Sequence, residues 1–199
     1  MTLPSVAHYD ALVANRAATY ASTRFEDVHQ DIIEFLPASG ARVLDVGAGS
    51  GRDAAALAAL GYAVTAVEPS RGMRKWALAN APQASVRWLD DALPALGSLT
   101  AEGVRFDFIL CSAVLMHLTT REVEASFQAM AALLAPGGAI AVSVRGAFPE
   151  DPPHLFHTHA TAALRRAASK ASLRLRAHGA NADQLGRSAI SWRWFVFQT

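Results

Sequence analysis

The sequence is poor in cysteine, with Cys111 as its only thiol in 199 residues. A single cysteine excludes an intramolecular disulfide framework and a zinc site built from several thiolates. Long apolar runs are also missing, because each is broken by a polar residue, proline or glycine before it could span a bilayer. The first residues lack the basic segment and apolar core of a secretory signal. We therefore expect a cytoplasmic protein.

The sequence has almost no excess of either charge. Lysine and arginine total 18 against 17 acidic residues, for a net charge of +1, so nothing argues globally for a nucleic-acid or membrane partner. A local basic bias towards the carboxyl end is opposed only by Asp183, and consists of Arg165, Arg166, Lys170, Arg174, Arg176, Arg187 and Arg193. They form no basic motif interleaved with aromatic residues of the kind found in single-strand binding grooves. A solvated face is the favoured interpretation.

The most informative stretch runs from residue 42 to residue 68. The segment 42–46 is short, rich in branched side chains and ended sharply by glycine, which is typical of a buried parallel strand. Three glycines at 47, 49 and 51 follow as a turn that a ligand can approach closely. An alanine-rich helix then runs to Gly61, a second strand covers 63–67, and Glu68 stands at its end. This order of strand, glycine turn, helix, strand and acid predicts a nucleoside site, in which the acid accepts hydrogen bonds from ribose hydroxyls.

The glycine spacing distinguishes between nucleosides. The dinucleotide pattern G-x-G-x-x-G, counted from Gly47, would require glycine where Arg52 stands. The chain instead reads D-x-G-x-G-x-G from Asp45, and a carboxylate there suits a ligand with a positive amino group better than a pyrophosphate. In these residues, and in the Ser-Arg-Gly-Met stretch that ends at Met73, the chain resembles the class I S-adenosylmethionine-dependent methyltransferases.

That resemblance implies S-adenosylmethionine as the cofactor and predicts its contacts. An aspartate after the third strand, at 85–89, is expected to accept a hydrogen bond from the adenine amine; Asp91 is the better match and Asp90 stays open. The fourth strand, 106–112, is expected to pass beside the sulfonium at its end. The predicted cofactor-binding residues are Asp45, Gly47, Ala48, Gly49, Gly51, Glu68, Pro69, Met73, Asp90, Asp91, Ala92, Ser112 and Ala113.

Two residues that follow strands on the expected ligand edge are candidates for acting on the methyl acceptor. His117 can serve as a general base, because an imidazole titrates near neutral pH; the alternative is that it fixes its loop. Arg145 can hold an acceptor carboxylate, or form an ion pair within the protein. The predicted lining of the acceptor pocket is Tyr20, Met116 and His157. Tyr9 and Arg16, which precede the core with Tyr20, are further candidates; the alternative is that the tyrosines pack and Arg16 is solvated.

Helices are expected at 8–20 and 26–36, before the nucleoside core, where they would cap the cofactor. Further helices are expected at 70–80, 120–134 and 160–171, and strands at 139–145, 172–178 and 191–198. The proline-rich loop 146–158 and its surroundings carry His154, His157 and His159, but few carboxylates and no cysteine lie near them. We predict no metal site there.

The resemblance implies a three-layer, Rossmann-like α/β fold with a mostly parallel seven-stranded sheet and an antiparallel last strand. It forms one domain over 1–199, with a helical cap at 1–37 and the core at 38–199. The expected function is transfer of a methyl group from S-adenosylmethionine to a small-molecule acceptor, anionic if Arg145 binds it, with release of S-adenosylhomocysteine. The alternatives are a methyltransferase acting on RNA or protein, and a protein that binds the cofactor without catalysis. The acceptor and the oligomeric state stay open.

Overall fold

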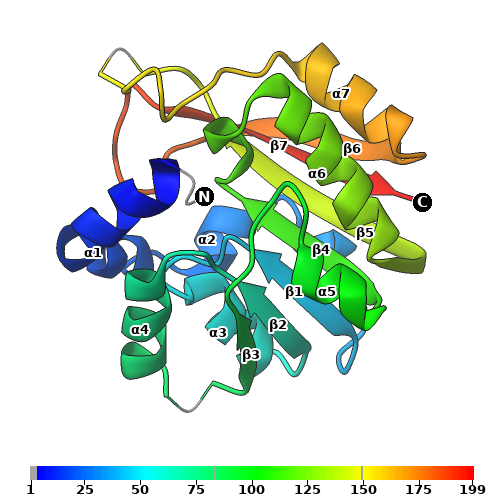
Figure 1. Ribbon diagram of the computed structural model, residues 1–199, viewed down its shortest axis with the longest axis horizontal. Helices are drawn as coiled ribbons and strands as arrows, with labels where there is room; N and C mark the ends of the chain where they lie inside the picture. The colour runs from blue at the N-terminus through cyan, green and yellow to red at the C-terminus, as the bar shows by residue number, and fades with distance from the viewer. Residues whose placement is uncertain (1–3, 83, 149) are drawn as a thin grey trace.

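The computed structural model describes residues 4–82, 84–148 and 150–199. Its centre is a sheet of seven strands in the order β3-β2-β1-β4-β5-β7-β6 (Figure 1). The strands are β1 (Arg42–Val46), β2 (Ala63–Val67), β3 (Val86–Leu89), β4 (Phe106–Ser112), β5 (Leu134–Arg145), β6 (Arg174–Ala182) and β7 (Ser191–Gln198). Only β7 pairs antiparallel with its neighbours, β5 and β6, among the strands described. The predicted fold class is therefore confirmed.

Helices precede the sheet and connect its strands. The α-helices are α1 (Pro4–Ala21), α2 (Phe25–His29), α3 (Arg52–Ala59), α4 (Arg71–Asn80), α5 (Gly97–Glu102), α6 (Thr120–Ala132) and α7 (Thr161–Lys170). Two short 3₁₀ helices are η1 (Ile33–Phe35) and η2 (Leu115–His117). Polar caps define where two helices begin: the Ser70 hydroxyl accepts from the Met73 amide at the start of α4, and Thr119 and Glu122 form a capping box at the start of α6.

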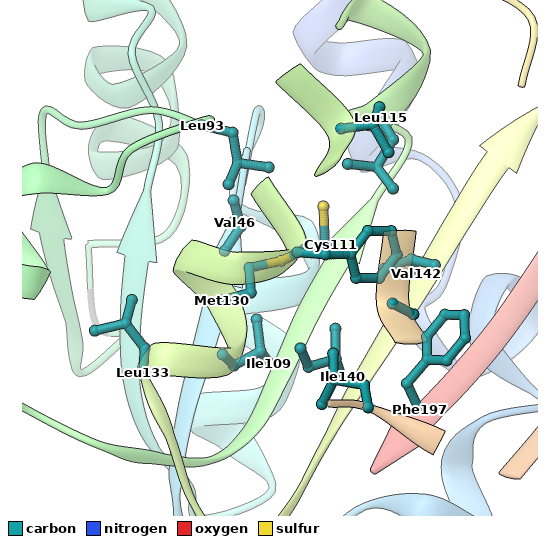
Figure 2. Close-up of a cluster of buried hydrophobic side chains, with 14 of the residues drawn as sticks. Val46, Leu93, Ile109, Cys111, Leu115, Met130, Leu133, Ile140, Val142 and Phe197 are labelled. Atoms are coloured by element: carbon teal, nitrogen blue, oxygen red, sulfur yellow. The ribbon is translucent and has the colours of Figure 1, made fainter. Parts of the chain in front are cut away.

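The sheet separates two apolar cores. One packs Phe127 and Met130 of α6 and Leu164 of α7 against inward residues of β4, β5 and β7. Figure 2 shows part of this cluster, with Cys111 and Ile109 of β4 beside Met130 and Ile140. The other core packs Ala54 and Leu57 of α3, with residues of the amino-terminal segment, against the opposite face. Apolar burial on both faces explains why the central strands are almost continuously apolar.

The expected helix over 26–36 is wrong, because α2 stops at His29 and only the turn η1 follows. Side chains on both sides of the break have distant partners: His29 Nε2 lies 3.0 Å from Asp53 Oδ2, and Asn181 Nδ2 donates to Asp31 Oδ2 over 2.9 Å. These tertiary hydrogen bonds outweigh the weak preference of the segment for a continuous helix.

Two strands and one helix also differ from expectation. Strand β5 begins at Leu134 rather than 139, because Leu134 pairs with Phe106 ahead of an irregularity in the ladder. Strand β6 runs over Arg174–Ala182 rather than 172–178, because its pairing with β7 extends as far as Ser191. Helix α5 was not expected: it is a single short stretch that begins at Gly97. No helix in the described ranges is both long and apolar enough to cross a membrane.

Candidate functional site

A cavity of about 580 Å³ opens at the carboxyl ends of β1, β2, β4 and β5. This volume lies in the range of about 300–1,000 Å³ that is typical of small-ligand sites. Parallel sheets bind ligands at this edge, where the strand order reverses between β1 and β4. Predicted site residues that line it are Gly47, Ala48, Gly49, Glu68, Pro69, Met73, Asp91, Ala92, Ser112, Ala113, Met116, His117, Arg145 and Tyr20.

The glycine turn after β1 presents backbone to the cavity. The amides of Gly47 and Ala48 donate to the Val67 carbonyl of β2 over 2.7 and 3.0 Å, which ties the turn to the neighbouring strand. Gly49 has a φ of +53°, and a Cβ built there would meet nothing closer than the Gly47 carbonyl at 4.0 Å. The space above Gly49 therefore belongs to the cavity, and a ligand can approach the backbone there.

Glu68 is held rigidly at the end of β2. Its Oε2 accepts from the Gly49 amide over 2.8 Å and its Oε1 accepts from the Ser70 amide over 2.7 Å. Each carboxylate oxygen has a second lone pair for a further donor. Burial raises the pKa of Glu68, although these two amides and Arg74 oppose the rise. The two free lone pairs of the carboxylate at the end of this strand fit the vicinal hydroxyls of a ribose, each of which can donate one hydrogen bond.

The two aspartates after β3 have different environments. Asp91 lines the cavity and its carboxylate accepts from the amides of Ala92 and Ser98, each over 2.8 Å. The Asp90 side chain is exposed and pairs with Arg74 over 2.6 Å, away from the cavity. The geometry favours Asp91 for the predicted adenine contact, while a contact from Asp90 stays a prediction.

Three other predicted residues do not line the main cavity among the residues described, namely Asp45, Gly51 and His157. Asp45 lies below the glycine turn, where burial and the nearby charge of Asp53 raise its pKa, and its Oδ2 has no hydrogen-bond partner. A Cβ at Gly51 would lie 2.9 Å from Ala77, so this glycine allows α3 and α4 to pack. His157 lies on a smaller cavity of about 150 Å³ beside the loop 146–158.

A buried ion network supports the start of α3. Arg52 donates to both carboxylate oxygens of Asp53, over 2.6 and 2.8 Å, and His29 of α2 lies against the same carboxylate. Although burial opposes ionisation, His29 and Arg52 hold the pKa of Asp53 below its ordinary value. Arg52, which replaces the third glycine of the dinucleotide pattern, therefore connects the glycine turn to the amino-terminal cap.

His117 has partners at both ring nitrogens. Its Nδ1 lies 2.9 Å from the Leu155 carbonyl, and its Nε2 lies 3.1 Å from the Tyr9 hydroxyl. Because a carbonyl only accepts, Nδ1 carries the ring proton and Nε2 accepts from Tyr9. Burial lowers the pKa of His117, with Arg145 adding to the effect. The imidazole is therefore neutral near pH 7, as a general base requires.

Arg145 ends β5 with its charge already compensated. Its Nη2 donates to Asp151 Oδ1 over 2.6 Å, and its guanidinium lies 4.5 Å from the centre of the Phe156 ring. A buried guanidinium requires a counter-charge, which we expected an anionic acceptor to supply. Asp151 supplies it instead, so that reason for an anionic acceptor no longer holds.

Tyr9 of α1, which was expected as a candidate for the wall, lines the cavity. The β6–β7 hairpin was outside the predicted site, and it contributes Leu185, Ile190, Trp192 and Trp194. Its sequence carries only a weak signal, because the two tryptophans alternate on one face of a strand. That pattern does not indicate which distant residues the face will meet. No group of three or more metal-ligating side chains occurs in the described part of the chain.

The comparison with protein families matches residues 20–198 to the family described as a methyltransferase domain. Among curated proteins, the ubiquinone biosynthesis O-methyltransferase of Xylella fastidiosa is 38% identical over 109 residues, which cover 54% of this chain and 43% of that protein. The protein of the same name from Methylocella silvestris is 32% identical, over 58% of this chain and 44% of its own length. The matches thus span less than half the length of these relatives.

Solved structures share the fold at low sequence identity. Magnesium protoporphyrin IX methyltransferase from Synechocystis PCC 6803, with bound S-adenosylhomocysteine, has a TM-score of 0.70 at 18% identity, covering 91% of this chain and 84% of that one. The 4+2 cyclase SpnF has a TM-score of 0.76 at 14% identity, covering 100% and 96%. These two likenesses establish the fold, which hosts more than one chemistry.

Proposed function

We propose, from the premise that the chain belongs to the methyltransferase-domain family, that it transfers the methyl group of S-adenosylmethionine to an oxygen of a small-molecule acceptor. The observation that carries this proposal is the buried Glu68 carboxylate, held by the Gly49 amide at the edge of an open glycine turn. The curated O-methyltransferases that match about half of the chain support an oxygen as the acceptor atom.

The cofactor would occupy the wall formed by the glycine turn, Glu68 and Asp91. Glu68 would accept from the ribose hydroxyls with its remaining lone pairs, and Asp91 would accept from the adenine amine. Met73, buried at the start of α4 and on the cavity wall, would pack beside the adenine. When bound, S-adenosylmethionine supplies an electrophilic methyl group, and its loss leaves S-adenosylhomocysteine as the released product.

The remaining space supports a small acceptor. Helix α1, the end of β5 and the β6–β7 hairpin all line the same cavity, and its wall there includes Tyr20, Met116 and Trp192. The Asn181–Asp31 hydrogen bond ties the hairpin to the amino-terminal segment across this space. The acceptor would be oriented by these walls, and orientation supplies most of the rate enhancement for an already strong electrophile. Arg145, with its charge met by Asp151, would shape the wall.

The test is methyl transfer from S-adenosylmethionine with a labelled methyl group to a small-metabolite extract, followed by isolation of the labelled product. We expect label in low-molecular-weight compounds, dependent on the protein and reduced in a Glu68→Ala variant. Label found only in added RNA or protein would instead support a macromolecular methyltransferase. Binding of S-adenosylhomocysteine without any transfer would support a protein that holds the cofactor without this reaction.

A further inference from the structure

His117 cannot present a free ring nitrogen to an acceptor in the observed arrangement. Its Nδ1–H donates to Leu155 and its Nε2 accepts from Tyr9, so both in-plane positions of the ring are used. The phenol ring of Tyr9 meets the imidazole edge-on, with ring centroids 5.4 Å apart. Any proton that reaches His117 from the cavity therefore passes through the hydroxyl of Tyr9.

The Tyr9 hydroxyl can still accept a hydrogen bond. A phenol oxygen donates once and has lone pairs for incoming donors, and Tyr9 lines the same cavity as Glu68 and Ala113. Burial, followed by the neighbouring Tyr20, raises the pKa of Tyr9, so its proton stays on oxygen unless His117 takes it. The residue is thus a neutral hydroxyl between the cavity and a neutral base.

Helix α1 is fixed in position next to the cofactor wall. Asp10, which follows Tyr9, accepts from the Ser70 hydroxyl over 2.5 Å and from the Gly72 amide over 2.9 Å. The amide of Ser70 in turn donates a hydrogen bond to Glu68 Oε1. Figure 1 shows the result, with α1 lying beside α4 at one end of the sheet. The position of Tyr9 is therefore coupled to the residue that would hold the ribose.

We propose that Tyr9 is the catalytic residue that contacts the acceptor hydroxyl, and that His117 acts through it as a positioning residue and terminal base. This inference rests on the proposed function. As the acceptor oxygen forms its bond to the methyl carbon, the electron pair of the breaking carbon–sulfur bond stays on sulfur. The acceptor proton passes to Tyr9, the Tyr9 proton passes to His117 Nε2, and the resulting imidazolium later releases it to water.

The relay requires His117 to be neutral, which gives it a pH dependence. The titratable and charged groups that face the imidazole are Tyr9 and His8 of α1, Arg145 of β5 and Asp151 of the loop. Burial, and then the charges of Arg145 and His8, lower the pKa of His117, while Asp151 acts in the opposite direction. Turnover is expected to be constant above this lowered pKa and to fall as the pH drops through it.

The first test is NMR of the histidine ring nitrogens, with the His117 signals assigned by their loss in a His117→Gln variant. We expect the neutral tautomer with the proton on Nδ1, and a pKa below that of a free histidine. A proton on Nε2 would overturn the relay, because Nε2 could then no longer accept from Tyr9. This measurement needs neither cofactor nor acceptor, so it is independent of the proposed function.

The second test compares Tyr9→Phe with Tyr62→Phe, in the labelled methyl-transfer assay with the metabolite extract and its isolated acceptor. Tyr62 is a matched control, because its hydroxyl also donates a hydrogen bond, to the Pro37 carbonyl, away from the cavity. Tyr9→Phe is expected to lower kcat by about 100-fold or more, the lower end for general acid–base catalysis. Affinity for S-adenosylhomocysteine should not change in either variant.

The role of His117 is separated from a merely structural one by the pH profile. His117→Gln should lower the plateau and remove the decline at low pH, and adding Tyr9→Phe to it should cost little more, because the two residues act as a unit. Tyr9→Phe activity within about twofold of Tyr62→Phe would overturn the relay. Absence of transfer by the wild-type protein, with the expected tautomer present, would overturn the proposed function and thus the relay's catalytic role.

Discussion

The two sides of the cavity are built in different ways. The cofactor side consists of the glycine turn, Glu68, Asp91 and the start of α4, and the hydrogen bonds within it join residues close in the chain: 19 positions separate Gly49 from Glu68, and two separate Glu68 from Ser70. The acceptor side consists of Tyr9, His117, the Arg145–Asp151 pair and the β6–β7 hairpin. There, 108 positions separate Tyr9 from His117 and 150 separate Asp31 from Asn181.

This difference corresponds to a difference in chemistry. The cofactor side is made mostly of backbone amides and two carboxylates, which would bind the part of the ligand that every reaction with this cofactor shares. The acceptor side is made of side chains from elements that meet only in the folded protein. Substitutions on the two sides should therefore separate, with one group affecting cofactor affinity and the other affecting stability or turnover.

The largest effect, a loss of stability caused by a change on the acceptor side, is expected from Asp151→Ala. Arg145 is only 8% exposed, and loss of its partner leaves a buried charge unpaired. We expect the free energy of unfolding to fall by about 3 kcal/mol, the lower end for breaking a buried pair. Calorimetric unfolding of the variants should show that Arg145→Met combined with Asp151→Ala recovers most of the lost free energy of unfolding. An Asp151→Ala protein as stable as the wild type would mean that the guanidinium is free to bind an anion.

A smaller effect, confined to the cofactor side, is expected from Glu68→Ala. Removal of this acceptor should weaken S-adenosylhomocysteine binding by about 1–3 kcal/mol, the scale of hydrogen bonds to a charged group. Glu102→Ala is the control, because that carboxylate pairs with Arg87 outside the cavity. Equal affinities of the two folded variants for S-adenosylhomocysteine in titration calorimetry would show that Glu68 does not contact the cofactor.

The smallest effect concerns the hairpin on the acceptor side. Although burial opposes ionisation, hydrogen bonds from Arg187 and Trp192 lower the pKa of Asp183 to about 2. A carboxyl whose pKa is lower in the folded state stabilises the protein above its unfolded pKa, and this stability is lost as the pH falls towards 2. We expect about 1–2 kcal/mol from Asp183, after allowance for the solvent exposure of its partner Arg187.

Unfolding curves between pH 5 and pH 2 can measure this contribution, with Asp183→Asn as the comparison. The wild-type protein should lose stability faster than the variant as the pH drops, because only the wild type has this carboxylate to protonate. Parallel losses in the two proteins would show that the hairpin does not depend on the ionised side chain.

The two sides also differ in how far the sequence predicted them. The strands and the glycine turn of the cofactor side were predicted because their signals are local in the sequence. Short branched segments, the glycine spacing and Glu68 all fall within a single βαβ unit. The parallel sheet with its antiparallel last strand followed from the resemblance that these residues carry. Asp91 and Asp90 are adjacent and chemically identical, so the resemblance favoured Asp91 but left Asp90 open. The structure has Asp91 on the cavity and Asp90 paired with Arg74.

The acceptor side was only partly predicted because its contacts are set by tertiary packing. His117 and Arg145 were expected on the cavity, since both follow strands on its edge. Their partners Tyr9, Leu155 and Asp151 come from α1 and the loop after β5, and no spacing rule links them. The break between α2 and η1 had the same cause, since it depends on hydrogen bonds to α3 and to the hairpin.

The most direct test of the cofactor assignment is titration calorimetry of the wild-type protein with S-adenosylhomocysteine and, separately, with NAD. The open glycine turn, the fixed Glu68 carboxylate and Arg52 at the third dinucleotide position predict saturable binding of S-adenosylhomocysteine and no binding of NAD. Tighter binding of NAD than of S-adenosylhomocysteine would contradict the assignment of the cofactor side, and with it the proposed methyl transfer.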